Sequence, residues 1–418
     1  SITDHMGAGR GGTWGFGGTL ALSVGFYGLL SFALMRSMRI DAYELGQTRI
    51  DLLAYWVAML IAVLLGVRLF SLGRMQFAPL FLVFLLIFYA ALILTLTAPG
   101  RSPIAFLISR FGVVTWFLLG IGVGGVFDVL QKARAFGRMR FAKGAFLVAA
   151  GALSAFMVQF ALLYMVFPIS TLRYQSVSDS AAIFLIMTVG AMEALWGARK
   201  PIVLPVAYLL VGTIIAGAIV RMQSTSIVAL WGGVMVVFFW GLFWNSRAFV
   251  KVLLVTALIA GAGYFTQTEA FEDITQNTRF SVFFGNGSGD RSVFSSLSSR
   301  LEILNGFADQ FAIAPLTGNF QAEILSGAGV GNFVHSLPLS FLTHTGIVGA
   351  VIFIAVVAML LKKRLFQDPR IDPAERQFGR LMLVVLALGT ISTFMTWSVL
   401  WFMMGVLCRR PATLVERN

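Results

Sequence analysis

Apolar runs long enough to cross a membrane recur along most of this sequence. An α-helix needs about 20 apolar residues to cross the hydrocarbon core of a bilayer, so each run predicts a membrane-spanning helix. The first run lacks a clear cleavage site and is expected to be an uncleaved helix. Nine runs precede a polar-interrupted stretch, and one run and a longer final block follow it: 14–35, 52–72, 77–96, 111–130, 145–167, 181–196, 202–220, 227–244 and 250–265, then 337–361 and 381–407.

The composition excludes a soluble globular protein and several other classes. Of the 418 residues, 58% are hydrophobic and only 12% are charged, with a mean hydropathy of +0.87. Such values lie outside the range of soluble domains and leave little chain for a separate soluble unit. The one cysteine, Cys408, cannot form an internal disulfide or supply a cysteine-based metal site.

We therefore predict an all-α polytopic membrane protein of about 12 transmembrane helices, with 11 as the alternative. The number depends on the final block, which polar residues interrupt, so that it forms either one tilted helix or two short helices. Residues 1–265 are expected to hold transmembrane helices 1–9, residues 266–335 a large periplasmic loop, and residues 336–418 the C-terminal transmembrane helices. Together they form a single integral membrane domain. Glycines at 120, 122, 124 and 125 predict close helix packing.

The distribution of lysine and arginine predicts the orientation. Alternate loops hold 18 of the 31 basic residues, including all six lysines, whereas the other loops hold ten arginines. Basic residues concentrate in cytoplasmic loops, so the stretch 266–334 is expected outside the cytoplasm, in the periplasm of a Gram-negative cell. This bias also accounts for the net charge of +13 without nucleic-acid binding. Arg409, Arg410 and Arg417 at the carboxyl end favour splitting the final block into two passes.

The stretch 266–334 is where we expect the chemistry, because it is the only large region predicted outside the membrane. Ser299 and Glu302 form a capping box that opens a helix, and apolar residues then recur at spacings of three and four up to Phe311. The spacing predicts an amphipathic helix along the membrane surface that stops before Pro315. The glycine-rich run 327–331 either brings backbone close to a ligand or forms the turn that returns the chain to the bilayer.

Two motifs in this region resemble those of a known family. His335-Ser336, nine residues, then Gly346-Ile347-Val348-Gly349 is similar to the histidine motif of bacterial O-antigen ligases. Ser299-Arg300-Leu301-Glu302 and Ala314-Pro315-Leu316-Thr317-Gly318 resemble the corresponding stretch of the wider superfamily of O-antigen ligases and polymerases. In the superfamily, Pro-Leu-x-Gly usually runs directly into Val-Gly-x-Gly-Asn-Phe. In this sequence those residues are divided between 318–320 and 329–333. The similarity covers about residues 298–353, and upstream it is mainly architectural.

The resemblance implies a glycosyltransferase of the bacterial inner membrane whose active site faces the periplasm. The donor would be a glycan on undecaprenyl diphosphate, and the acceptor a hydroxyl of lipid A-core or of another glycan. His335 would be the general base that activates the acceptor hydroxyl. Arg221, Arg291 and Arg300 would bind the diphosphate, since guanidinium forks suit phosphate oxygens. Direct displacement by this route inverts the anomeric carbon and needs no metal or cofactor.

Other interpretations of the same residues stay open. His335 could be a residue at the entry of a helix, and the arginines could contact lipid headgroups. His344 also competes for the base, but it lies deeper in the helix and is expected to bond another helix. An O-antigen or exopolysaccharide polymerase would use the same donor. A lipid-linked sugar transporter or flippase is a third alternative, although its ionisable groups would lie near the midplane, whereas Asp128 and Glu193 lie near segment ends.

Overall fold

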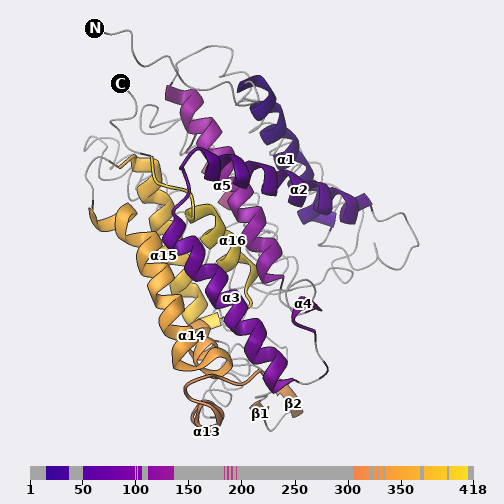
Figure 1. Cartoon of the computed structure of the whole chain (residues 1–418), viewed down its shortest axis with the longest axis vertical. Helices are drawn as coiled ribbons and strands as arrows, with labels where there is room; N and C mark the ends of the chain where they lie inside the picture. Colours follow the sequence, from indigo (N-terminus) through magenta and orange to yellow (C-terminus); the bar gives the residue numbers. More distant parts are fainter. Residues whose placement is uncertain are drawn as a thin grey trace, which may run out of the picture.

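The computed structural model is a bundle of mostly helical segments (Figure 1). It describes residues 16–36, 50–98, 100, 102–105, 112–135, 306–320, 324–326, 329–332, 336–367, 371–392 and 395–412, with six further residues between 183 and 194. Five of the helices in these ranges are long and apolar enough to cross a membrane. They indicate a membrane-embedded protein, as the apolar runs predict.

The helices follow the predicted runs closely where the structure describes them. The first four runs form α1 (Phe16–Arg36), α2 (Ile50–Ser71), α3 (Phe77–Thr97) and α5 (Val113–Ala135), with the short α4 (Pro103–Ala105) between α3 and α5. The run at 337–361 forms α14 (Leu337–Lys362), which continues into a π-helical turn, η5 (Lys363–Gln367). These boundaries are predictable because the thickness of the bilayer sets the length of each run.

The final apolar block is divided into two helices, which is one of the two alternatives that the sequence left open. α15 (Pro373–Ser392) is followed by α16 (Ser398–Leu407). Glu375 at the start of α15 pairs with Arg409 just beyond the end of α16, so the two helices run antiparallel. The ten residues of α16 span only about 15 Å, half the thickness of a bilayer core. All ten are buried.

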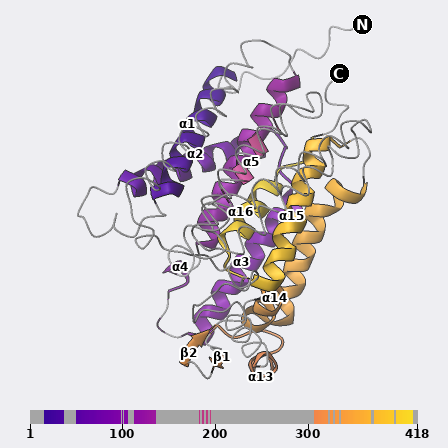
Figure 2. The ribbon, with the colours of Figure 1, turned by 180° about the vertical axis from the view of Figure 1, so that it is seen from behind.

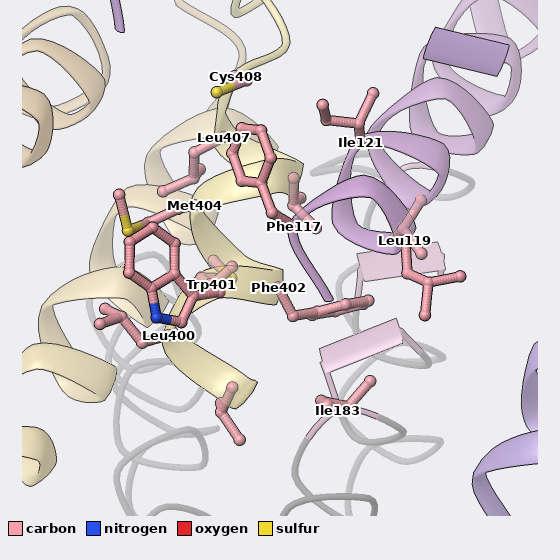
Figure 3. Packing of buried hydrophobic residues seen from close by; sticks show 14 of the residues in the cluster. Phe117, Leu119, Ile121, Ile183, Leu400, Trp401, Phe402, Met404, Leu407 and Cys408 are labelled. Atoms are coloured by element: carbon pink, nitrogen blue, oxygen red, sulfur yellow. The ribbon is translucent and has the colours of Figure 1, made fainter. Parts of the chain in front are cut away.

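The core of the bundle is the contact between α5 and α16, the most extensive contact between two elements in the described structure. Figure 3 shows Phe117 and Phe402 between the two helices, with Trp401 and Met404 on α16. Gly120 and Gly124 of α5 face the backbone of α16, and Gly122 and Gly125 face α2 at Ala62 and Leu65. The predicted close packing at these glycines is therefore confirmed, since a side chain at any of them would overlap a neighbour or touch it tightly.

Six described residues fall in the run predicted at 181–196, and all six are helical. They recur at spacings of three and four, so they lie on one face of a helix. Tyr27 Oη donates to the carbonyl oxygen of Met187 at 3.1 Å, and Gly190 lies against the ring of Phe127. This face therefore packs against α1 and α5. The six are Ile183, Ile186, Met187, Gly190, Ala191 and Ala194.

The segment before α14 contributes α13 (Phe307–Ile313) and a small antiparallel hairpin of β1 (Ile324–Ser326) and β2 (Gly329–Asn332). α13 ends before Pro315, as predicted. The hairpin is an addition to the all-α fold class that we expected. Part of the glycine-rich run therefore pairs with β1. Both views place α13 and the hairpin together at one end of the bundle, beside the first residues of α14 (Figures 1 and 2).

Several predictions fall outside the described residues. They include the helices expected at 145–167, 202–220, 227–244 and 250–265, the first part of the loop at 266–305, and Glu193. The total of about 12 spans, the domain boundaries and the orientation of the loop stay predictions.

Candidate functional site

The helix that follows the histidine motif is interrupted at Gly346. Within α14 this residue has φ 64° and ψ −168°, a backbone conformation that is almost exclusive to glycine. The interruption removes the regular hydrogen bonds of the next turn, so Ile347 and Val348 need other acceptors. In a membrane helix such groups must be satisfied by protein, because lipid offers no partner.

The loop that follows α13 supplies those partners. Ile347 N–H donates to the carbonyl of Pro315 at 2.9 Å, and Val348 N–H donates to the carbonyl of Leu316 at 3.2 Å. In return, Asn319 N–H donates to the carbonyl of Thr343 at 2.8 Å. The loop 315–320 therefore inserts into the interruption and replaces its missing hydrogen bonds.

Two glycines make this close approach possible. Gly318 has φ 81°, and a Cβ there would overlap the backbone of α14 at His344. A Cβ on Gly346 would overlap the carbonyl of Leu316. Both glycines belong to the stretches that carry the family resemblance, one in Pro-Leu-Thr-Gly and the other in the histidine motif. The fold brings the two motifs into backbone contact.

The end of α3 fixes the other side of the loop. Tyr89 Oη donates to the carbonyl of Thr317 at 3.1 Å, and Phe320 N–H donates to Thr97 Oγ1 at 3.2 Å. The loop is thus held between α3 and α14, two helices that pack along each other. This arrangement holds the loop against the first half of α14.

The first turn of α14 begins where the apolar run 337–361 begins. Ser336 is the N-cap residue with extended backbone, although its side chain makes no capping bond, and Pro338 lies in the first turn. Ser340 Oγ accepts the N–H of Met395 at 2.7 Å, and the carbonyl of Met395 accepts Trp401 Nε1 at 2.7 Å. The connection between α15 and α16 therefore supports the residues that directly follow His335.

His344 is buried below this turn. Its Nδ1 lies 2.8 Å from the carbonyl of Ser340 in the same helix. A carbonyl can only accept, so Nδ1 carries the proton and Nε2 is left as the acceptor nitrogen. Phe320 meets the imidazole edge to face, with ring centroids 5.2 Å apart. We expected His344 to bond another helix, whereas its Nδ1 bonds a carbonyl of its own helix, α14.

The four predicted site residues lie outside the described part of the chain. His335 immediately precedes Ser336, the N-cap residue of α14, but its own side chain is not described. Arg221, Arg291 and Arg300 fall in ranges that are likewise not described. The described structure brings together the glycine and proline elements of the two motifs, and it leaves the roles of the histidine and the arginines as predictions.

The structure also contains a buried charge cluster that the sequence did not reveal. Glu375 on α15 pairs with Arg364 of η5 at 3.3 Å and with Arg409 beyond α16, and it accepts Gln131 Nε2 of α5 at 3.0 Å. Arg364 also donates to the carbonyls of Leu407 and Arg409, at 2.9 and 2.6 Å. We call Arg364, Glu375, Arg409 and Gln131 the Glu375 cluster. Gln131 and Arg409 lie so far in sequence from each other that no local pattern signals their contact.

A second carboxylate, Asp128, lies buried on α5, three residues before Gln131 of the Glu375 cluster. It pairs with Arg74 at 2.9 Å and with Arg68 and Lys132 at 3.5 Å each. Its position near a helix end agrees with the prediction. Both clusters lie towards the end of the bundle reached by the last residues of α14, a helix about 40 Å long. The 315–320 loop and the hairpin lie towards the opposite end (Figure 1).

Comparison with known proteins gives no match, either to a protein-family profile or to a curated protein.

Proposed function

We propose that this chain is an O-antigen ligase-type glycosyltransferase of the bacterial inner membrane. It transfers a glycan from undecaprenyl diphosphate to an acceptor hydroxyl of lipid A-core, on the periplasmic face. The observation that carries the proposal is the insertion of Pro315–Gly318 into the interruption of α14 at Gly346. Two motifs that resemble the same family, and that are separated in sequence, are hydrogen-bonded to each other. A shared functional site gives a reason for that contact.

The proposed chemistry follows from the residues next to this contact. His335 directly precedes the N-cap residue of α14 and acts as general base on the acceptor hydroxyl, since an imidazole changes protonation near neutral pH. Arg221, Arg291 and Arg300 bind the diphosphate leaving group through charged hydrogen bonds. Displacement from the face opposite the diphosphate inverts the anomeric carbon. About 12 spans and a periplasmic loop at 266–335 complete the proposed topology.

The separation between charge clusters and loop supports this orientation. Four cations of the two clusters belong to the loops and helix ends that are predicted to be cytoplasmic, and the fifth, Arg409, belongs to the carboxyl end. The four are Arg68, Arg74, Lys132 and Arg364. The inserted loop and the hairpin lie towards the other end of α14 (Figure 2). If the active site faces the periplasm, the cytoplasmic cations must lie at the other end of the bundle from the inserted loop, as they do here.

The test is glycan transfer by the purified protein in liposomes that contain lipid-linked donor and lipid A-core acceptor. His335→Ala should lower turnover by about a hundredfold or more, the usual loss on removing a general base, while the protein stays folded. His344→Ala is the matched control: it should lower thermal stability but retain transfer per folded molecule.

The outcomes separate the alternatives. If His335→Ala keeps more than about a tenth of wild-type turnover, the base is another residue. Elongation of the lipid-linked glycan without transfer to lipid A-core would identify a polymerase. Movement of the donor across the membrane without transfer would identify a transporter.

A further inference from the structure

Gln310 is a polar residue in the middle of the buried face of α13. Only 7% of its surface is exposed, whereas Asp309 and Ile313 on the same helix are exposed. Its side-chain Nε2 is buried and has no hydrogen-bond partner in the described structure. A buried amide without a partner destabilises the fold, so such a group in a native protein needs an explanation.

The position of α13 brings this amide to the region of the candidate site. α13 leads directly into the loop 315–320, and Gly318 N–H donates to the carbonyl of Ala314, at the end of α13, at 2.8 Å. Among the described elements, α13 packs mainly against α14, the helix that the loop enters at Gly346. Gln310 therefore lies on the inward side of a helix at the same end of the bundle as the contact between the two motifs (Figures 1 and 2).

Two aromatic rings accompany the amide on the same side of the helix. Phe307 and Phe311 are one turn apart, and with Gln310 they fall within one arc of the helix. Their rings are stacked, with centroids 5.7 Å apart, and both residues are half-buried. Ligand sites combine aromatic side chains with a few placed polar groups in this way. The combination suits a sugar, because its hydroxyl oxygens accept hydrogen bonds while the C–H face of its ring packs on an aromatic ring.

We propose that Gln310 is a substrate-binding residue whose amide donates to a hydroxyl of the acceptor glycan. The inference rests on the proposed glycan transfer, in which the base that meets the acceptor directly precedes α14. Because Nε2 is buried, α13 has to shift before a sugar reaches it. A helix of seven residues is too short to be stable alone, so its position depends on its packing. The glycan then supplies the partner that the amide lacks while α13 is packed down.

The experiment measures glycan affinity and stability in one variant, Gln310→Met, which keeps the length of the side chain but removes the amide. The probe is core oligosaccharide released from lipopolysaccharide, and calorimetry measures its binding to the full-length protein in detergent. The variant should bind it about three- to tenfold more weakly, the loss expected for one hydrogen bond. Its thermal stability should equal that of the wild type or exceed it, because an apolar group replaces a buried amide without a partner.

Gln377→Met on α15 is the matched control, since Gln377 bonds Arg380 in its own helix, and it should leave oligosaccharide affinity unchanged. Lower stability of Gln310→Met than of the wild type would show that the amide is structural and would overturn the proposal. So would a wild-type protein that does not bind the oligosaccharide.

Glycan transfer in liposomes separates this inference from the proposed function. If the wild type transfers glycan and Gln310→Met keeps the wild-type affinity and KM for the acceptor, Gln310 does not bind the substrate and the proposed function stands. If oligosaccharide binding depends on Gln310 but the wild type transfers no glycan, the binding role stands and the proposed function is wrong.

Discussion

At the scale of single residues, the conformation of Gly346 decides whether the loop can insert into α14. Its φ of 64° with ψ −168° costs about 1–3 kcal/mol for any other residue, and a Cβ would also overlap the carbonyl of Leu316. We therefore expect Gly346→Ala to displace the loop 315–320 and to lower thermal stability markedly. Thermal unfolding of the detergent-purified protein measures this effect.

The control for this prediction is a glycine without such constraints. Gly25 of α1 is exposed, and a Cβ there would meet nothing within 4 Å. Gly25→Ala should therefore leave stability unchanged or raise it slightly, because alanine favours helix. Equal stability of Gly346→Ala and Gly25→Ala would mean that the interruption of α14 is not required for the fold.

These residues also show which part of the site the sequence could predict. The family resemblance selected Gly318 and Gly346, and the apolar run 337–361 predicted where α14 begins. The interruption itself was not predicted, because Gly346-Ile347-Val348-Gly349 lies inside an unbroken apolar run that reads as regular helix. The hydrogen bond from Ile347 to Pro315 forms only in the folded chain, and the hydropathy of the run cannot predict it.

At the scale of elements, α16 depends on its contact with α5 because it is too short to be stable alone. Gly405 of α16 faces the carbonyl of Phe117 and lies near Gly120, so the two backbones touch directly. Small residues of this kind drive helix association in membranes, where lipid is as apolar as the side chains. Gly405→Ala should cost about 1–3 kcal/mol through overpacking, measured by unfolding in mixed micelles.

The matched control for Gly405 is Gly28→Ala on α1, where a Cβ again meets nothing within 4 Å. If both substitutions leave stability equal, α5 and α16 do not depend on close backbone contact. The existence of α16 as a separate helix was one of two alternatives in the sequence. The polar residues between 390 and 396 marked the break, but hydropathy could not say that the short second helix would be wholly buried.

At the scale of the whole molecule, the Glu375 cluster joins elements from distant parts of the chain. Glu375 is fully buried between Arg364 and Arg409, and Gln131 connects both Glu375 and Arg409 to the central helix α5. Gln76 donates to the carbonyls of Leu407 and Arg409, at 3.3 and 3.1 Å, which adds the start of α3. The cluster therefore holds the ends of α5, α14, α15 and α16 in one arrangement.

Removing the carboxylate tests that role. Glu375→Gln keeps the shape of the side chain but leaves the positive charges of Arg364 and Arg409 buried without their counter-charge. Breaking a buried ion pair in this way costs about 3–5 kcal/mol, so we expect a large loss of stability on unfolding in mixed micelles. Arg380→Gln is the control: Arg380 is partly exposed and bonds Gln377 one turn away on α15, at 3.4 Å, and such a surface contact is worth about 1 kcal/mol or less. A loss for Glu375→Gln no larger than that of Arg380→Gln would show that the four helix ends are held by apolar packing alone.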